Sequence, residues 1–150
     1  MRCGWPNRCA GRFSAFALAL GLCGAAGAGD NSARLPLRIG PHAFHVEVAA
    51  TPHERARGLM GRTHLPAEGG MLFVFERPGR QCFWMRDTLL PLSIAFIDST
   101  GRIARLADMQ PQTDTRHCPG ADVRFALEVR QGEFRRRGIT PGALVEGLPQ

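Results

Sequence analysis

Lysine and tyrosine are absent from the sequence, and so are long apolar runs and a glycine-rich phosphate-binding loop. Without lysine the chain can form no Schiff base and carries no P-loop lysine, and without tyrosine it has no phenolic nucleophile. The most apolar stretch, residues 89–97, contains a proline and is only nine residues long, whereas a membrane-spanning helix needs about 20 apolar residues. These absences exclude several large classes of enzyme and predict that residues 89–97 do not cross a membrane.

The composition is that of a globular protein with a basic excess. The 150 residues are 44% hydrophobic and 21% charged, which suits a folded chain of one domain. All 19 Lys+Arg residues are arginines, and against 13 acidic residues they give a net charge of +6.

The first 28 residues have the layout of a secretory signal peptide. Arg2, Arg8 and Arg12 precede the apolar run 13–22, and a small-residue cleavage pattern ends at Ala28. This order of basic, apolar and small residues predicts export to the periplasm or beyond, with cleavage after Ala28. The apolar run is too short for a membrane anchor.

Cleavage would leave residues 29–150 as a single β domain with a lower charge. It removes three arginines and no acidic residue, so the net charge falls from +6 to +3. That value, together with the lack of a basic stripe interleaved with aromatic residues, argues against a nucleic-acid partner. Lipid attachment at Cys23 is the alternative processing route, and the large Leu22 before it disfavours that route.

Two cysteines, Cys82 and Cys118, remain after the predicted cleavage. An even pair in an oxidising compartment predicts one disulfide. Such a bond would close a loop of 35 intervening residues, worth about 3–4 kcal/mol on the chain-entropy model. The alternative is two separate buried thiols.

Short apolar segments separated by turn residues predict an all-β domain: an antiparallel sandwich, or a partly closed jelly-roll-like barrel, with one or two short helices. Thr51, Pro52 and Glu54 form a capping box that predicts a short helix after the second strand. A second helical turn is expected at 132–137. The expected strands are 34–39, 43–49, 71–75, 82–85, 89–97, 102–107, 122–130 and 143–146.

In the segment 122–130 apolar and polar residues alternate, with one interruption at Ala126. Alternation of this kind predicts a half-exposed antiparallel strand. Glu128 and its polar neighbours are therefore expected to face solvent.

A set of short segments distinguishes this sequence: 57–62 (RGLMGR), 70–75 (GMLFVF), 83–92 (FWMRDTLLPL), 96–98 (FID), 101–103 (GRI), 126–128 (ALE), Gly132 and 138–139 (GI). Together they resemble a known bacterial and archaeal family, domain of unknown function 192. The resemblance covers about residues 40–146 and implies a small, mostly exported β-sandwich or jelly-roll-like domain, with no activity attached. The family commonly has Asn where this chain has Asp87, which argues against an amide-specific role there.

The segment around Trp84 is the first candidate ligand site. Asp87 and Thr88 would supply a carboxylate and a hydroxyl at the mouth of an apolar pocket, with the ligand stacked on Trp84. The structural alternative is that these small polar residues only cap backbone groups in a turn.

Arg57 and Arg62 are the second candidate, because arginine binds carboxylates and phosphates through two parallel hydrogen bonds. The structural alternative is an internal salt bridge to Asp87, Asp98 or Glu76.

No resident cofactor or metal is expected. Met85, His117 and Cys118 offer soft ligands that suit Cu(I), but their spacing forms no motif, and a disulfide would occupy the thiol. The histidines likewise form no zinc motif.

The sequence therefore favours a non-catalytic envelope domain that binds a small ligand, a polymer or a protein partner. No serine lies in a nucleophile elbow, and a carboxylate pair such as Glu68 with Glu76 or Asp87 is too common to indicate catalysis. The catalytic residues, if any, are unassigned. An envelope enzyme acting on glycan or peptide is the first alternative, and copper binding is the second.

Overall fold

The structure is a computed structural model, and it describes residues 34–150. The predicted signal peptide and its cleavage point after Ala28 lie outside these residues. Within the described part, no helix is long and apolar enough to cross a membrane.

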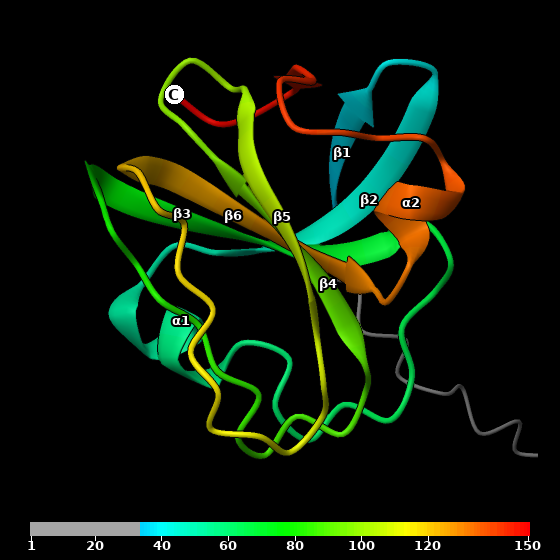
Figure 1. Cartoon of the computed structure of the whole chain (residues 1–150), viewed down its shortest axis with the longest axis vertical. Coiled ribbons are helices and arrows are strands. Elements are labelled where there is room, and N and C mark those ends of the chain that lie inside the picture. The colour runs from blue at the N-terminus through cyan, green and yellow to red at the C-terminus, as the bar shows by residue number, and fades with distance from the viewer. Residues whose placement is uncertain (1–33) are drawn as a thin grey trace, which may run out of the picture. The chain divides into compact units, whose positions relative to one another are not determined.

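Seven strands form one continuous sheet in the order β5-β4-β6-β3-β2-β1-β7 (Figure 1). Two short helices, α1 (Pro52–Arg57) and α2 (Glu133–Arg136), accompany it. The strands are β1 (Leu35–Ile39), β2 (His42–Ala49), β3 (Gly69–Gly79), β4 (Leu92–Ile97), β5 (Ile103–Met109), β6 (Val123–Arg130) and β7 (Val145–Glu146).

The sheet curls into a half-barrel, which confirms the prediction of a mostly β, partly closed architecture. Its pairing is mixed rather than purely antiparallel, because β2 and β3 run parallel. The crossover between these two strands carries α1 and residues 58–68. All other pairs of neighbouring strands are antiparallel.

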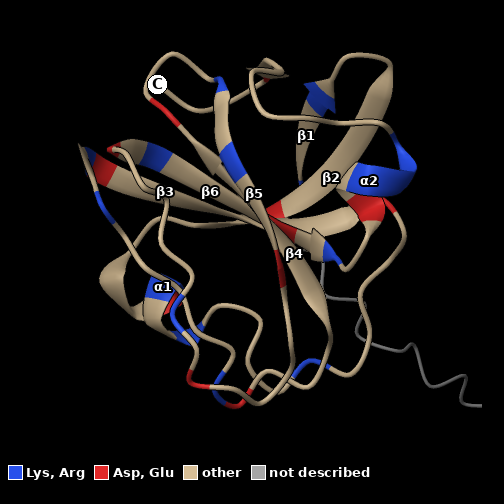
Figure 2. Ribbon diagram, viewed as in Figure 1, with Lys and Arg blue, Asp and Glu red and all other residues tan. Residues whose placement is uncertain are grey.

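Both faces of the sheet are buried against apolar side chains. One face packs Leu72, Leu127 and Phe134 into a cluster beneath α2. The other packs Phe73, Phe96 and Met85 into a second cluster, which includes residues that follow α1. Charged side chains are few along the central strands and gather on the helices, the loops and the strand ends (Figure 2). A sheet covered on both faces explains why β4 is buried along its whole length.

The first helix begins where the capping box predicts. The Glu54 backbone N–H donates to Thr51 Oγ1 at 3.2 Å, and the Thr51 backbone N–H donates to Glu54 Oε2 at 2.9 Å. The helix ends at Arg57 because Gly58 adopts a positive φ of 48°.

Two predicted strands differ from the structure. Residues 82–85 form no strand and contribute only an isolated antiparallel bridge between Phe83 and His117. The strand expected over 89–97 begins at Leu92, after Pro91, because proline lacks the N–H that a central strand must donate.

Candidate functional site

A cavity of about 230 Å³ opens between the end of α1, strand β3 and the loop 80–88. It lies on the face of the sheet that carries the second apolar cluster. Its lining combines the end of a helix, two aromatic side chains from β3 and one acidic residue from β6. The lining residues are Arg55, Ala56, Arg57, Gly58, Leu59, Met60, Phe73, Phe75, Gln81, Cys82, Phe83, Trp84, Thr88 and Glu128.

Glu128 is the acidic residue of this cavity. It lies in the middle of β6, opposite Met71 of β3 on one side and Ile94 of β4 on the other. Its side chain is 4% exposed, and no hydrogen bond or ion pair joins its carboxyl group to another described residue. Burial raises the pKa of Glu128 to about 8, because a low-dielectric surrounding disfavours the charged form. At neutral pH the group is therefore mostly an uncharged carboxylic acid.

Three phenylalanines form the apolar wall of the cavity. The Phe83 ring meets Phe73 edge-on at a centroid distance of 4.9 Å and Phe75 at 6.3 Å. The centre of the Phe83 ring also lies 5.9 Å from that of Phe96, in the same apolar cluster. Edge-to-face packing of this kind fixes the rings against one another, so the wall keeps its shape without a ligand.

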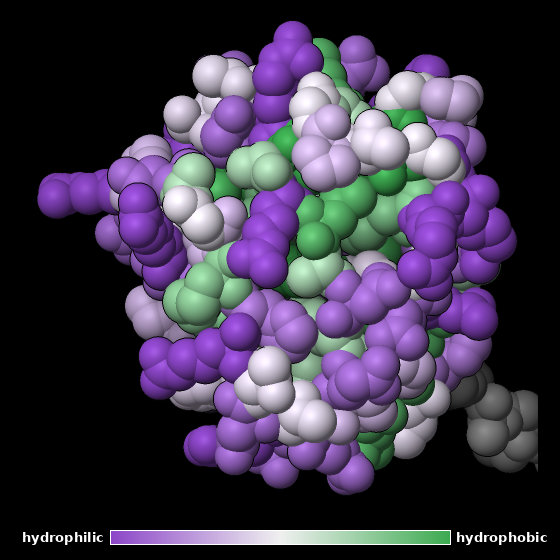
Figure 3. Space-filling view, in the orientation of Figure 1, coloured by the Kyte–Doolittle hydropathy of each residue, from purple (hydrophilic) through white to green (hydrophobic). Residues whose placement is uncertain are grey.

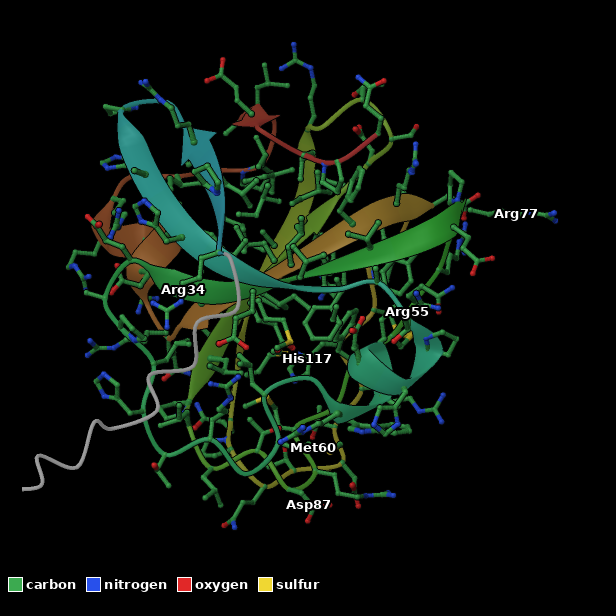
Figure 4. The ribbon with its side chains drawn as sticks, turned by 180° about the vertical axis from the view of Figure 1, so that it is seen from behind. Arg34, Arg55, Met60, Arg77, Asp87 and His117 are labelled. Atoms are coloured by element: carbon green, nitrogen blue, oxygen red, sulfur yellow. A yellow bond between two sulfur atoms is a disulfide. The ribbon has the colours of Figure 1, made fainter. Side chains whose placement is uncertain are left out.

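Two arginines of α1 bring positive charge to the cavity. Arg55 Nη1 donates to the Val74 carbonyl at 3.0 Å, and its guanidinium group lies 5.5 Å from the centre of the Phe75 ring. Figure 4 shows Arg55 between the helix and the sheet. Arg57 is exposed and makes no ion pair with any residue in the described part of the chain.

The loop that carries Phe83 and Trp84 is fastened to the loop 110–122. A disulfide joins Cys82 to Cys118, with an S–S distance of 2.10 Å, so the predicted pairing is present. The Phe83 N–H donates to the His117 carbonyl at 2.9 Å, and the reciprocal bond is 2.8 Å long. These contacts turn two long loops into one wall of the cavity.

The structure brings together only part of the predicted site at Trp84. Trp84 and Thr88 line the cavity, whereas Asp87 does not and its side chain is exposed. In Figure 4, Asp87 lies at the outer end of its loop. Guanidinium groups of Arg86 and Arg116 lie over the Trp84 ring, at 5.2 and 5.9 Å from its centre. Thr88 Oγ1 donates to the Arg86 carbonyl at 3.4 Å.

The two arginines predicted as one site do not line the same cavity. Arg57 lines the cavity, and Arg62 forms an ion pair with Glu47 instead. An internal salt bridge was the structural alternative for this pair of arginines. Arg62 has such a bridge, but to Glu47, which is not among the three acids named from the sequence. Glu47 lies on β2 and Arg62 lies in the crossover between β2 and β3, so it is the fold that brings the two side chains together.

The chain matches one family model, DUF192, described as uncharacterized ACR, over residues 35–147. It belongs to this family. No curated protein matches the sequence. Two solved structures resemble this DUF192 domain, each with a TM-score of 0.72. One, from Sinorhizobium meliloti 1021 and provisionally assigned as a transcription regulator, shares 33% identity and covers 76% of this chain and 92% of its own. The other, a protein of unknown function from Novosphingobium aromaticivorans DSM 12444, shares 37% identity and covers 74% and 83%.

Sequence reasoning missed Glu128 because it placed this residue on a solvent-facing side of β6. That expectation is wrong: β6 is buried on both sides from Phe125 to Val129. The interruption at Ala126 was the available signal, since a small apolar residue among polar ones indicates that this face is also covered. In this DUF192 domain the cover is the cavity wall described above.

Metal ligands do not gather in the described part of this DUF192 domain. No three His, Cys, Asp or Glu side chains among residues 34–150 lie close enough to hold a metal ion. Of the soft ligands considered for Cu(I), Cys118 is in the disulfide and Met85 is 1% exposed within the core. His117 has a lowered pKa because of burial and the nearby charge of Arg105.

A second hollow, of about 370 Å³, lies between β5 and α2 on the opposite face of the sheet. Apolar side chains gather over this region in Figure 3. Its polar groups are mutually satisfied: Ser93 Oγ donates to Asp108 and accepts from the Gly132 N–H at 2.8 Å, and Asp108 pairs with Arg135 at 3.3 Å. Ser93, Asp108 and Arg135 therefore have structural partners, in contrast to Glu128.

Proposed function

We propose that this DUF192 domain is an exported, non-catalytic binding domain whose cavity takes a small ligand beside Glu128. The observation that carries the proposal is the unpartnered carboxyl group of Glu128, buried in a cavity between aromatic rings and arginines. Pockets for small molecules are commonly apolar with a few convergent polar groups, and this cavity has that composition.

Glu128 lies in the interior without a protein partner, and its carboxyl oxygens open onto the cavity, since only Arg124 Nε is a fully buried and unpartnered side-chain atom among residues 34–150. Leaving a buried hydrogen-bonding group unsatisfied costs about 1–3 kcal/mol, and native proteins retain few such groups. Replacing Glu128 by leucine would remove that cost, so a folding role does not account for a glutamate at this position. A ligand atom that hydrogen-bonds to the carboxyl group does account for it.

Binding without turnover fits the lining better than catalysis does. Glu128 is the only carboxylic acid among the residues that line the cavity, and no serine or histidine accompanies it. Glycoside hydrolysis uses a pair of carboxyl groups, and acyl transfer uses a nucleophile with an adjacent base. The only hydroxyl in the lining, that of Thr88, already donates to a backbone carbonyl.

Export to the periplasm or beyond is part of the proposal. It is supported by the signal-peptide pattern of residues 1–28 and by the disulfide between Cys82 and Cys118, since disulfides persist in oxidising compartments. The test is to produce the full chain in a bacterium with two membranes and to determine the N-terminus of the periplasmic protein by mass spectrometry. We expect Gly29 as the first residue. Retention of residues 1–28 on soluble cytoplasmic protein would contradict export.

Ligand binding is tested by NMR on residues 29–150 with a library of small fragments. We expect hits whose chemical-shift changes cluster on α1, β3 and residues 80–88. Glu128→Leu should weaken these hits about tenfold, the worth of one buried hydrogen bond. Glu76→Leu is the matched control, because Glu76 is exposed on the same sheet. A library without any hit in the cavity, or hits that are indifferent to Glu128→Leu, would overturn the proposal.

A further inference from the structure

We propose that the ligand is a small organic carboxylate with a second oxygen acceptor, such as a keto acid, bound with its carboxylate at Arg57 and the acceptor at Glu128. This inference rests on the proposed function and adds the chemical class of the ligand. It follows from the charges that face the cavity, from the hydrogen-bonding form of Glu128 and from the apolar surface between them.

The cavity is lined by positively charged arginines at the end near α1 and by the mostly uncharged Glu128 on β6. Arg55 and Arg57 are the charged residues among those that line it, apart from Glu128 itself. Arg57 makes no ion pair within residues 34–150. An anionic group gains from both guanidinium groups, and a cationic ligand is repelled by them. The ligand class is therefore anionic at this end.

The elements packed around Glu128 add no further charge. Strand β3 presents Met71 beside it, and β4 presents Ile94. Glu47 of β2 is one strand further away, because Met71 of β3 lies between it and Glu128. Glu47 forms an ion pair with Arg62. On β6 itself, Arg130 is exposed at the end of the strand, and the guanidinium group of Arg124 lies over the Phe125 ring, 5.5 Å from its centre. No neighbouring cation is therefore placed to hold Glu128 in its ionised form.

An uncharged Glu128 donates a hydrogen bond. A protonated carboxyl group has one O–H, which in this structure meets no acceptor among the described residues. A carbonyl or ether oxygen of the ligand would fill that role. Between this oxygen and the carboxylate, the rings of Phe73, Phe75 and Phe83 require an apolar connection. Keto acids with an aliphatic or aromatic body meet all three requirements.

The test measures binding by calorimetry at about pH 7 with matched pairs of probes. The keto acids are 5-oxohexanoate, 6-oxoheptanoate and 4-acetylbenzoate, which vary the distance between the two oxygen functions. Their partners hexanoate, heptanoate and 4-ethylbenzoate lack the ketone. We expect at least one keto acid to bind about tenfold more tightly than its partner. Equal affinities in all three pairs, or no binding by any keto acid, would overturn the inference.

The pH dependence identifies Glu128 as the donor. The probes remain ionised and the arginines remain charged between about pH 7 and pH 9. The protonated fraction of Glu128 falls as the pH rises through its raised pKa, so affinity should fall about tenfold in total between pH 7 and pH 9. Glu128→Gln keeps an N–H donor without a titrating proton, and should bind at both pH values with the same affinity. If the affinity of Glu128→Gln falls between pH 7 and pH 9 as much as that of the wild type does, the assignment is wrong.

Arg57→Gln tests the other end of the ligand. It should weaken 4-acetylbenzoate about tenfold and leave its uncharged methyl ester unaffected. Arg77→Gln is the matched control, because Arg77 is an exposed arginine that points away from the body of the protein in Figure 4. Equal losses in both variants, or none in either, would overturn the role of Arg57. If the fragment screen finds amines or sugars in the cavity and no carboxylates, the ligand class is wrong while the proposed binding function stands.

Discussion

Glu128 and Glu133 lie five residues apart, and both side chains are buried, with exposures of 4% and 0%. Glu133 receives hydrogen bonds from Arg136 and Arg137, the second at 3.1 Å, and these ion pairs hold α2 together. Burial by itself raises the pKa of Glu133, but the hydrogen bonds and charges of the two arginines lower it by more, so the pKa lies below its usual value. Glu128 has only the burial, and its pKa rises.

The comparison separates an acid that is part of the fold from one that has no structural partner, and this difference supports the proposed ligand site at Glu128. A buried carboxylate with two arginine partners is part of the fold, since its removal would leave cations without counter-charges. A buried acid without partners contributes nothing to stability that a leucine would not contribute better. Burial alone therefore does not distinguish the two acids, and the absence of partners is the observation that supports the proposed role of Glu128.

Glu133→Ala is expected to have the largest effect on stability. Loss of the carboxylate removes the counter-charge of Arg137, whose side chain is 14% exposed, and of Arg136, which is 61% exposed and therefore screened by solvent. The free energy of unfolding should fall by about 3 kcal/mol, the lower end of the range for a buried ion pair. Urea denaturation followed by circular dichroism measures this change. A loss below about 1 kcal/mol would mean that the ion pairs are not structural.

Glu128→Gln should change how stability depends on pH. Because the folded-state pKa of Glu128 lies above the unfolded value, its contribution is fully present below pH 4.5 and is lost as the pH rises toward about 8. The slope is about 1.4 kcal/mol per pH unit. The difference in unfolding free energy between the variant and the wild type should therefore grow by about 2–3 kcal/mol from pH 5 to pH 7. A constant difference would show that Glu128 titrates normally. Glu133, with its lowered pKa, acts in the opposite direction and loses its contribution as the pH falls below about 4.5.

Glu128→Leu should stabilise the protein even at about pH 5, where ionisation has little influence. Replacing an unsatisfied buried carboxyl group by an apolar side chain should raise the free energy of unfolding by about 1–2 kcal/mol. The measurement is again urea denaturation, and the matched Glu133→Leu should be destabilising. If both leucine variants lose stability, Glu128 supports the fold and the contrast between the two acids disappears.

Arg57→Gln should have the smallest effect. The side chain is exposed and has no ion pair among the described residues. The free energy of unfolding should therefore change by less than about 0.5 kcal/mol. Thermal denaturation monitored by calorimetry is sufficient. A larger loss would indicate that Arg57 is held by the fold rather than available to a ligand.

Local patterns were enough to predict most elements of the fold. The capping box at Thr51 and Glu54 involves neighbours in sequence, and its two hydrogen bonds are both present. The alternation in β6, and the turn residues that bound the apolar segments of β1 and β2, placed these strands within a few residues. The disulfide followed from the two cysteines left after the predicted cleavage.

The candidate site was less predictable because it depends on what covers each face of the sheet. Alternation shows which side of β6 is apolar, but it cannot show that loops far away in sequence cover the other side. The same limit applies to Arg62, whose partner Glu47 is brought near by the parallel pairing of β2 and β3. Trp84 and Thr88 were found because they lie in a distinctive local segment, whereas Glu128 becomes recognisable only from its burial.

The position of Trp84 also has a spectroscopic consequence. It is the only tryptophan in residues 34–150, it is 42% exposed, and it lies at the cavity. Because the chain contains no tyrosine, near-ultraviolet emission from this domain arises almost entirely from one indole. The intensity and wavelength of that emission report on the wall of the cavity itself, so occupancy can be followed without an attached dye.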